Sequence, residues 1–416
     1  MEYAHRFAHR TRALMPSPIR KLAPLMRRPG MISFGGGYPN PTTFAFDSVN
    51  IQFRSGQSFT IDKDLIDLAC QYGPTDCHPM LLPELQSWHE AKDHWRPEPA
   101  QIQVLNGSQE GLHIMAYLFL DPGDCVAVSE PAYPGALGAF RAFTDNFLPF
   151  PIDEHGTITE ALEAILHDRK CAGEPMPKFI YEVPNGHNPG GVGLSLERRK
   201  HLLEISRTFD IPILEDDPYQ LIQLEDRDPL PTLQHMDTDG RVIRLDSFSK
   251  IFAPGLRIGY ATGPEPVIRM FQLYKQGTNL HVSAMIQVIL AGYLGTHGSN
   301  GFFRLIRRNC ALYRTNRDAM VAAARKWLPE TVRFTIPREG MFIWLELPDP
   351  VDAQSMLDRY GLEHQVLAVP GPAFSTRNGL KNGLRLSFSM VSEAQIETGM
   401  QRLGEMIRKT LEGAAE

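Results

Sequence analysis

The chain has 416 residues, of which 43% are hydrophobic and 22% are charged, and its formal net charge at pH 7 is −6. This length allows two domains with an ample core, and the composition is ordinary for a globular protein. The negative charge disfavours non-specific nucleic-acid binding, and no stretch approaches the roughly 20 apolar residues of a membrane span.

Cysteine usage indicates the compartment. The five cysteines are an odd number and form no Cys-x-x-Cys pair. Free thiols in a reducing cytoplasm fit this pattern better than a disulfide framework or a metal site. The basic first residues are not followed by the apolar stretch of a secretory signal, so we expect a cytoplasmic protein.

From residue 101 onward, apolar strands alternate with helices. An apolar stretch at 102–105 leads to Asn-Gly-Ser-Gln and an apolar helix that stops near 121–123. Further strands are predicted at 126–128, 179–183, 211–214, 242–245 and 257–261, with an amphipathic helix at 195–209. Such alternation favours a mostly parallel sheet covered by helices on both faces.

The pattern changes after about residue 300. A long helix is expected to place Leu312, Met320, Ala323 and Trp327 on one face, and two strands are predicted at 332–336 and 341–347. A final helix begins at a capping box of Ser392 with Gln395. We expect it to bury Ile396, Met400, Leu403 and Ile407. This part is typical of a smaller α+β domain.

The stretch 246–250 reads Asp-Ser-Phe-Ser-Lys and follows a predicted strand. The amine of Lys250 is able to form a Schiff base with an aldehyde. Ser247, Ser249 and Arg257 would supply hydrogen bonds and charge to a phosphate. The stretch therefore suits a phosphate-bearing aldehyde cofactor, although such a string on its own is more often a solvated turn.

Polar residues also follow two other predicted strands. Asn188 comes after the strand at 179–183, and Asp216 and Tyr219 come after the strand at 211–214. In open α/β sheets, ligands bind at the carboxyl ends of the strands. We expect these side chains to belong to a binding site.

The order Asn, Asp-x-x-Tyr, Ser-x-Ser-Lys and Arg is similar to that of fold-type I pyridoxal phosphate (PLP) enzymes. The stretches 17–20, 36–41, 130–133, 215–219 and 247–250 resemble the motifs of the aminoadipate/kynurenine aminotransferases of class I. This resemblance implies an N-terminal arm at 1–30 and a large domain at 48–299 with a mostly parallel seven-stranded sheet. Residues 31–47 and 300–416 would form a smaller α+β domain, and two subunits would form a homodimer with shared active sites.

The resemblance implies roles for five residues. Lys250 would hold PLP and then shuttle a proton between substrate and cofactor. Asp216 would keep the pyridine nitrogen protonated, Tyr219 and Asn188 would reach the phenolic oxygen of the cofactor, and Tyr133 would stack on its ring. Lys250, Asp216 and Tyr219 are the expected catalytic residues.

The phosphate is expected at the strand–turn–helix around residue 107. Backbone amides at a helix N-terminus favour an anion, and a glycine lets the backbone approach closely. Tyr72 would reach the phosphate of the neighbouring subunit. The expected phosphate ligands are Gly107, Ser108, Gln109, Ser247, Ser249, Arg257 and Tyr72.

Substrate binding is expected from a further set. Arg385 matches the arginine that clamps the α-carboxylate, because guanidinium geometry suits a bidentate carboxylate. Asn188 would assist it, and Arg20, Gly37 and Tyr38 would line the side-chain pocket.

Three stretches depart from the family pattern. His187 and Gly190 replace more usual residues near Asn188, the segment 73–83 is longer than usual, and residues 35–38 are rich in glycine. These changes indicate either an unusual substrate or neutral drift.

Three functions remain open at this point. The first is an aminotransferase acting on an aminoadipate-like, aromatic or branched 2-amino acid, with a 2-oxo acid such as 2-oxoglutarate as acceptor. The second is a PLP enzyme for elimination, replacement or carbon–carbon bond formation on a substrate such as S-adenosylmethionine. The third is a PLP-binding transcriptional regulator, which the absence of a basic DNA-binding segment disfavours.

Overall fold

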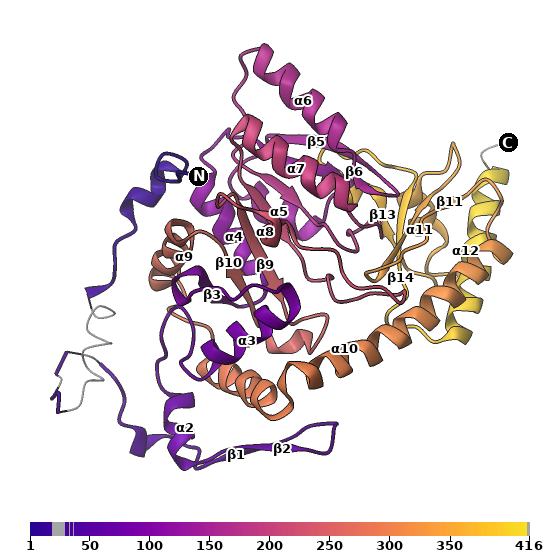
Figure 1. Ribbon diagram of the computed structural model, residues 1–416. Coiled ribbons are helices and arrows are strands. Elements are labelled where there is room, and N and C mark those ends of the chain that lie inside the picture. Colours follow the sequence, from indigo (N-terminus) through magenta and orange to yellow (C-terminus); the bar gives the residue numbers. More distant parts are fainter. Residues whose placement is uncertain (19–29, 33, 36, 414–416) are drawn as a thin grey trace. The chain divides into compact units, whose positions relative to one another are not determined.

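The computed structural model describes residues 1–18, 30–32, 34–35 and 37–413 (Figure 1). These residues form two compact units. The first unit holds residues 1–121 and 237–305, and the second holds 122–236 and 306–416. Arg20, an expected substrate residue, lies outside the described residues. Among the described residues, no helix is long and apolar enough to cross a membrane.

The first unit contains a three-stranded antiparallel set. Strand β10 (Gly259–Thr262) pairs on one side with β3 (Ile102–Leu105) and on the other with β9 (Val242–Ser247). Helix α4 (Ser108–Phe119) packs closely on these strands, because a Cβ added at Gly111 would lie 2.6 Å from Cδ2 of Leu245. Helices α3 (Leu81–Asp93) and α9 (Glu265–Gly277) belong to the same unit.

A hairpin in the first unit was not predicted from the sequence. Strands β1 (Val49–Gln52) and β2 (Ser58–Ile61) pair antiparallel, and α2 (Lys63–Cys70) follows (Figure 1). The side chain of Asp62 caps α2 by accepting from the Leu65 amide at 3.1 Å. A buried cluster joins this segment to the start of α10: Ile61, Ile66, Ala69 and Val288.

The first residues of the chain contact their own unit. The phenol of Tyr3 donates to the Gly240 carbonyl at 2.9 Å, and its ring meets the Phe119 ring at 6.2 Å. The Ala8 amide donates to the Leu118 carbonyl, just before the short helix η1 (His9–Ala13). The expected role of residues 1–30 as an arm on a partner subunit stays a prediction.

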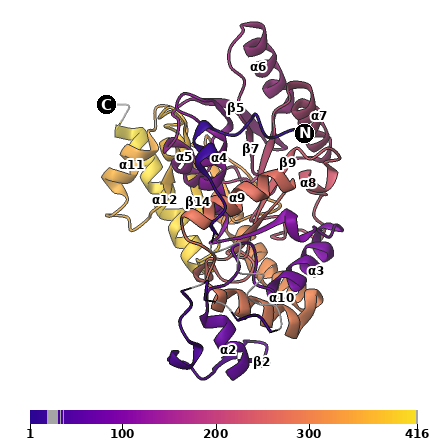
Figure 2. The same cartoon turned by 90° about the vertical axis from the view of Figure 1, so that its left-hand side faces the viewer.

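The second unit contains the parallel strands. Its strand order is β8 (Ile213–Asp216), β7 (Ile180–Glu182), β4 (Val126–Glu130), β5 (Phe147–Asp153) and β6 (Gly156–Thr157). All these neighbours pair parallel except β5 and β6. Helices α6 (Thr159–Cys171) and α7 (Leu196–Phe209) lie side by side in both views (Figures 1 and 2). Helices α5 (Pro134–Arg141) and α8 (Leu233–Met236) complete this part.

A second, antiparallel sheet lies in the same unit. Its order is β11 (Arg333–Phe334), β12 (Phe342–Glu346), β14 (Gly383–Ser387) and β13 (Val369–Pro370). Helices α11 (Ala353–Tyr360) and α12 (Glu393–Gly413) accompany it. The capping box is confirmed, because Ser392 and Gln395 exchange backbone-to-side-chain hydrogen bonds, and α12 buries the four expected apolar residues.

Helix α10 (Ala284–Trp327) contains one non-helical residue, Gly298, whose φ is 61°. Of the residues expected on one face of this helix, Met320 and Ala323 are buried, whereas Leu312 is 58% exposed.

The expected α/β class is confirmed. Leaving out the two-residue β6, the first set of three strands and the parallel set of the second unit hold seven strands, as the resemblance implies. The compact units divide the chain differently from the expected domains at 48–299 and 300–416, and those domain boundaries stay a prediction.

Candidate active site

In the first unit, the turn between β3 and α4 is shaped to receive an anion. Gly107 precedes α4 with a φ of 80°, a conformation that favours glycine. A Cβ at this position would lie 2.7 Å from Nη2 of Arg257, which donates to the Asn106 carbonyl at 3.1 Å. Arg257 thus lies against the N-terminus of α4, where backbone amides and the helix dipole both favour negative charge.

The segment that follows β9 brings further predicted residues to this turn. Nη1 of Arg257 donates to Oγ of Ser249 at 3.4 Å, and the Ser249 amide donates to Oγ of Ser247 at 3.2 Å. Lys250 is the next residue and is half-buried. The buried Phe248 anchors this segment, because its amide bonds to the Ile258 carbonyl. Gly107, Ser249 and Arg257 therefore lie together in the first unit.

A group of rings surrounds Tyr72 in the first unit. Its ring lies 6.0 Å from that of Tyr38 and 6.1 Å from that of His281, edge to face in both cases. The His281 imidazole accepts from the Gly73 amide at Nε2 and donates from Nδ1 to the Val282 carbonyl. Tyr72 itself is 49% exposed.

In the second unit, Asp216 ends strand β8 and is buried. The phenol of Tyr181, on the neighbouring strand β7, donates to Oδ2 of Asp216 at 2.9 Å. Burial and the Asp216 carboxylate both hold the pKa of Tyr181 above its usual value, so this phenol stays a donor. The sequence analysis did not single out Tyr181, because it reads as one more residue of an apolar strand.

Arg385, on β14, lies in an aromatic pocket of the second unit. Its Nη1 donates to Oδ1 of Asn188 at 2.8 Å, and its guanidinium carbon lies 4.4 Å from the Phe342 ring centroid and 5.1 Å from that of Phe374. Its buried Nε has no hydrogen-bond partner among the described residues. Burial lowers the pKa of Arg385, which nevertheless remains a cation. This arrangement suits a carboxylate ligand.

Tyr219 belongs to the same group of residues. Its ring meets the Phe342 ring edge to face at 5.9 Å. Burial, and then the charge of Asp216, raise the pKa of Tyr219, while Arg385 and a hydrogen bond with Asn188 oppose the rise. Tyr219, Asn188 and Arg385 are therefore brought together in the second unit.

Tyr133 lies at the start of α5, where it is the N-cap residue. A Cβ added at Gly135 would fall 2.4 Å from Cζ of Tyr133, so glycine makes room for this ring. The preceding Ala132 amide donates to the carbonyl of Phe374 at 2.9 Å.

His187 fixes the turn that carries Asn188. Its Nδ1 accepts from the Gly190 amide at 3.2 Å, so the proton lies on Nε2, which donates to Ser129 at 2.9 Å. Burial lowers the pKa of His187 to about 4, which keeps the imidazole neutral. A Cβ at Gly190 would lie 2.9 Å from Cδ1 of Ile152. The two departures from the family pattern are thus compatible with one well-ordered turn.

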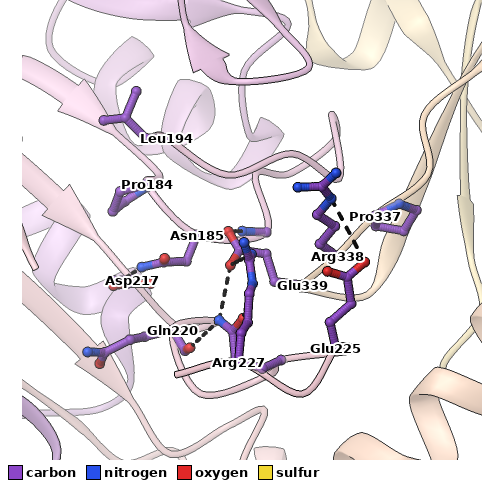
Figure 3. Close-up of polar contacts among 12 residues, drawn as sticks. Pro184, Asn185, Leu194, Asp217, Gln220, Glu225, Arg227, Pro337, Arg338 and Glu339 are labelled. Carbon is purple, nitrogen blue, oxygen red and sulfur yellow. Dashed lines mark hydrogen bonds and ion pairs between the residues drawn. The ribbon is translucent and has the colours of Figure 1, made fainter. Parts of the chain in front are cut away.

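A second network holds the other end of this turn (Figure 3). Asn185 donates to Oδ2 of Asp217 at 2.7 Å and accepts from the buried Arg199 at 2.7 Å. Glu339 accepts from the Gly186 amide at 3.0 Å and from Arg227 at 2.9 Å. Sequence reasoning missed these residues, because their partners are far apart along the chain.

The groups described above fit the two charged parts of a cofactor that carries a phosphate and a pyridine ring. The first unit supplies a glycine turn, a helix N-terminus and an arginine, which suit the phosphate. The second supplies a buried carboxylate at a strand end, which suits a protonated ring nitrogen.

Comparisons with known proteins agree with this fit. Residues 64–403 match the family model "Aminotransferase class I and II". The chain is 35% identical to the mitochondrial kynurenine/alpha-aminoadipate aminotransferase of Mus musculus, over 99% of this chain and 100% of that protein. It is 32% identical to the 2-aminoadipate transaminase of Thermus thermophilus, over 99% of this chain and 98% of that protein.

A solved structure gives the same result. The kynurenine aminotransferase of Pyrococcus horikoshii, crystallised with PMP, is 34% identical, and the alignment covers 99% of this chain and 98% of that one. The TM-score between the two is 0.79.

Proposed function

Because this chain belongs to the class I and II aminotransferases, PLP enzymes that move an amino group from an amino acid to a 2-oxo acid, we propose how its own residues perform that transfer. When bound, PLP supplies an electron sink that allows the Cα proton of the amino acid to leave. The observation that carries the proposal is the pairing of Arg385 with Asn188 between two aromatic rings, beside Tyr219.

Lys250 is the proposed catalytic base. Its amine would hold PLP at the aldehyde carbon. Once the amino group of a substrate frees this amine, it would serve first as the base for the substrate Cα proton and then as the acid toward C4′ of the cofactor.

Asp216 is proposed to keep the ring nitrogen protonated. A buried carboxylate opposite a pyridinium favours the charged form of both partners. The hydrogen bond from Tyr181 supports this role, because it occupies Oδ2 and orients the carboxylate. Tyr219 and Asn188 are proposed to bind the phenolic oxygen, and Tyr133 to stack on the ring.

The phosphate is proposed to bind at the turn before α4. The amides at the N-terminus of α4 and the guanidinium of Arg257 would give charge-assisted hydrogen bonds. The full proposed set is Gly107, Ser108, Gln109, Ser247, Ser249 and Arg257.

Arg385 is proposed to bind the α-carboxylate of the substrate. Nη1 is already oriented by Asn188, and Nε, which has no partner within the described part of the chain, would be available for a carboxylate oxygen. The rings of Phe342 and Phe374 lie against the guanidinium and would reduce its contact with water, which would strengthen such a charged pair.

The proposed donors are aminoadipate-like or aromatic 2-amino acids, with 2-oxoglutarate as acceptor. This proposal is supported by the names of the mouse and Thermus thermophilus relatives. Tyr38, Gly37 and Arg20 are proposed to line the side-chain pocket. The comparisons favour transamination over elimination or replacement.

A homodimer is also proposed, in which Tyr72 reaches the phosphate bound by the neighbouring subunit. The half-exposed Tyr72 ring, held by Tyr38 and His281, supports this role. Mixing a Tyr72→Phe chain with a Lys250→Ala chain tests it, because shared sites would give partial complementation and separate sites would give none. The five free cysteines support a reducing compartment, for which we propose the cytoplasm.

The experiment for the function is a panel of donors followed by absorbance. Aminoadipate, kynurenine, phenylalanine and leucine are each added alone to the PLP-loaded protein. Conversion to the pyridoxamine form, reversed by 2-oxoglutarate, is the expected result. Product release from a leaving-group substrate, without any pyridoxamine form, would contradict transamination.

A further inference from the structure

A buried ion pair lies directly behind the turn at Gly107. Nζ of Lys275, on α9, donates to both carboxylate oxygens of Glu110 at 2.8 Å. Lys275 is fully buried, and the Glu110 side chain is 15% exposed. Burial lowers the pKa of Lys275, and Glu110 opposes that change.

Glu110 holds the turn in shape. Its Oε2 accepts from the Asn106 amide at 2.6 Å and from the Asn106 side chain at 3.2 Å. The carbonyl of the same Asn106 accepts from Arg257. The side-chain amide of Asn279 also donates to Oε1 of Glu110. The carboxylate therefore links the residue before Gly107 to the first turn of α4.

This arrangement creates an electrostatic problem for a phosphate. Glu110 is the third residue of α4, so a negative charge lies one turn from the helix N-terminus, where an anion is proposed to bind. A carboxylate there repels a phosphate dianion, and the low dielectric of a buried site strengthens the repulsion. The carboxylate can fasten the turn without weakening phosphate binding only if its charge is cancelled nearby.

We propose that Lys275 is a positioning residue for the cofactor phosphate: it neutralises Glu110, so that this carboxylate clasps the 106–110 turn without repelling the phosphate. The inference rests on the proposed function, because it assumes that the phosphate binds at Gly107, Ser108 and Gln109. Lys275 acts through Glu110 and not by touching the cofactor.

The test measures the dissociation constants of PLP and of pyridoxal, which lacks the phosphate, by absorbance titration of the apoprotein. Lys275→Met removes the cation and leaves the carboxylate. We expect it to weaken PLP binding on the order of tenfold or more while changing pyridoxal binding little. A merely structural role would weaken both ligands alike.

Two further variants check the charge argument. Adding Glu110→Gln to Lys275→Met removes both charges but keeps an oxygen for the Asn106 amide, and it should restore most of the PLP affinity. Lys275→Arg, which keeps the cation, should keep the wild-type affinity for PLP. Lys178→Met, which breaks the ion pair with Asp124 in the second unit, is the matched control and should leave both constants unchanged.

If Lys275→Met does not fold, Glu110→Gln alone decides. If the charge argument is right, the preference of Glu110→Gln for PLP over pyridoxal is at least as large as that of the wild type. A selective loss of PLP affinity in Glu110→Gln would overturn the proposal, as would equal loss of both ligands in Lys275→Met.

Arg257→Gln separates this failure from failure of the proposed function. If Arg257→Gln lowers the preference for PLP over pyridoxal but Lys275→Met does not, the phosphate site stands and the role of Lys275 is wrong. If neither variant lowers it, the phosphate binds elsewhere and both proposals fail.

Discussion

Arg385 donates a hydrogen bond to Asn188 at 2.8 Å although the two residues are separated by 197 positions in the sequence. Since Phe342 and Phe374 surround the guanidinium, its planar shape matters as much as its charge. Lysine at this position keeps the charge but loses both the bidentate donor geometry of the guanidinium and the contacts with the two rings. We predict that Arg385→Lys lowers kcat/KM about 100-fold, which corresponds to roughly 3 kcal/mol.

Steady-state kinetics with the best donor measure this effect, mostly as a rise in KM. Arg333→Lys is the matched control, because Arg333 is an exposed strand arginine paired with Glu346. Equal kinetics in wild type and Arg385→Lys would remove Arg385 from the substrate site.

Tyr181 and Asp216 give a second prediction. Tyr181→Phe removes the hydrogen bond from the phenol and leaves Oδ2 of a buried carboxylate with one donor fewer. We expect kcat/KM to fall roughly tenfold, because a hydrogen bond to a charged group contributes about 1.5–3 kcal/mol. The visible absorbance of the bound cofactor should also titrate at a different pH.

Tyr313→Phe, a half-buried tyrosine of α10, provides the comparison. An absorbance titration and kcat/KM that both stay at wild-type values in Tyr181→Phe would show that this phenol does not support Asp216.

These residues indicate what a sequence alone can predict. The capping box at Ser392 and the glycine turn at Gly107 follow local rules, and both were predicted. Six of the seven main strands were predicted, because buried strands read as apolar runs, whereas β5 at 147–153 was not predicted. Asn188, Asp216 and Tyr219 were singled out because they follow such strands, and Arg257 because it follows the Ser-x-Ser-Lys stretch in a recognisable order; their roles stay predictions.

Other features have no local signal. Glu339 contacts the Gly186 amide and Arg227 across more than 110 positions, so no spacing rule reveals it. The β1–β2 hairpin is different, because Val-Asn-Ile-Gln and Ser-Phe-Thr-Ile alternate apolar and polar residues with the period of a strand, a signal that the sequence analysis did not use. Lys275 reads as one charge on an amphipathic helix until its partner Glu110 is seen.

Stability should depend on pH through Glu182. Burial raises the pKa of this carboxyl from 4.5 to about 7, although Thr157 and Arg199 oppose the rise. The folded state therefore binds more protons than the unfolded state between these values. The contribution of Glu182 to the free energy of unfolding is fully present below pH 4.5. It is lost as the pH rises through 7, and the loss is on the order of 3 kcal/mol.

Glu182→Gln should remove that dependence and stabilise the protein at pH 8 relative to the wild type. Urea unfolding at pH 5 and pH 8 measures the change, and Glu330→Gln, at an exposed position, is the control. A wild-type free energy of unfolding that does not fall across this range, after correction for the control, would refute the assignment.

The Glu339 network gives a fourth prediction. A Cβ at Gly193 would lie 1.9 Å from Oε1 of Glu339, which also accepts from the Gly186 amide. Gly193→Ala should displace the carboxylate and destabilise the protein by about 1–3 kcal/mol. It should also raise KM, because the turn that carries Asn188 is loosened.

Gly138→Ala is the control, since a Cβ there meets nothing within 4 Å. Thermal unfolding and KM are measured for both variants. A Gly193→Ala protein with wild-type stability would mean that Glu339 can move away without loss.

The most direct test of the account is the identity of the residue that holds the cofactor. The PLP-loaded protein is reduced with borohydride, digested and analysed by mass spectrometry. The account predicts a pyridoxyl group on Lys250, no adduct in Lys250→Ala, and loss of turnover in that variant. An adduct on another lysine, or full turnover of Lys250→Ala, would contradict it.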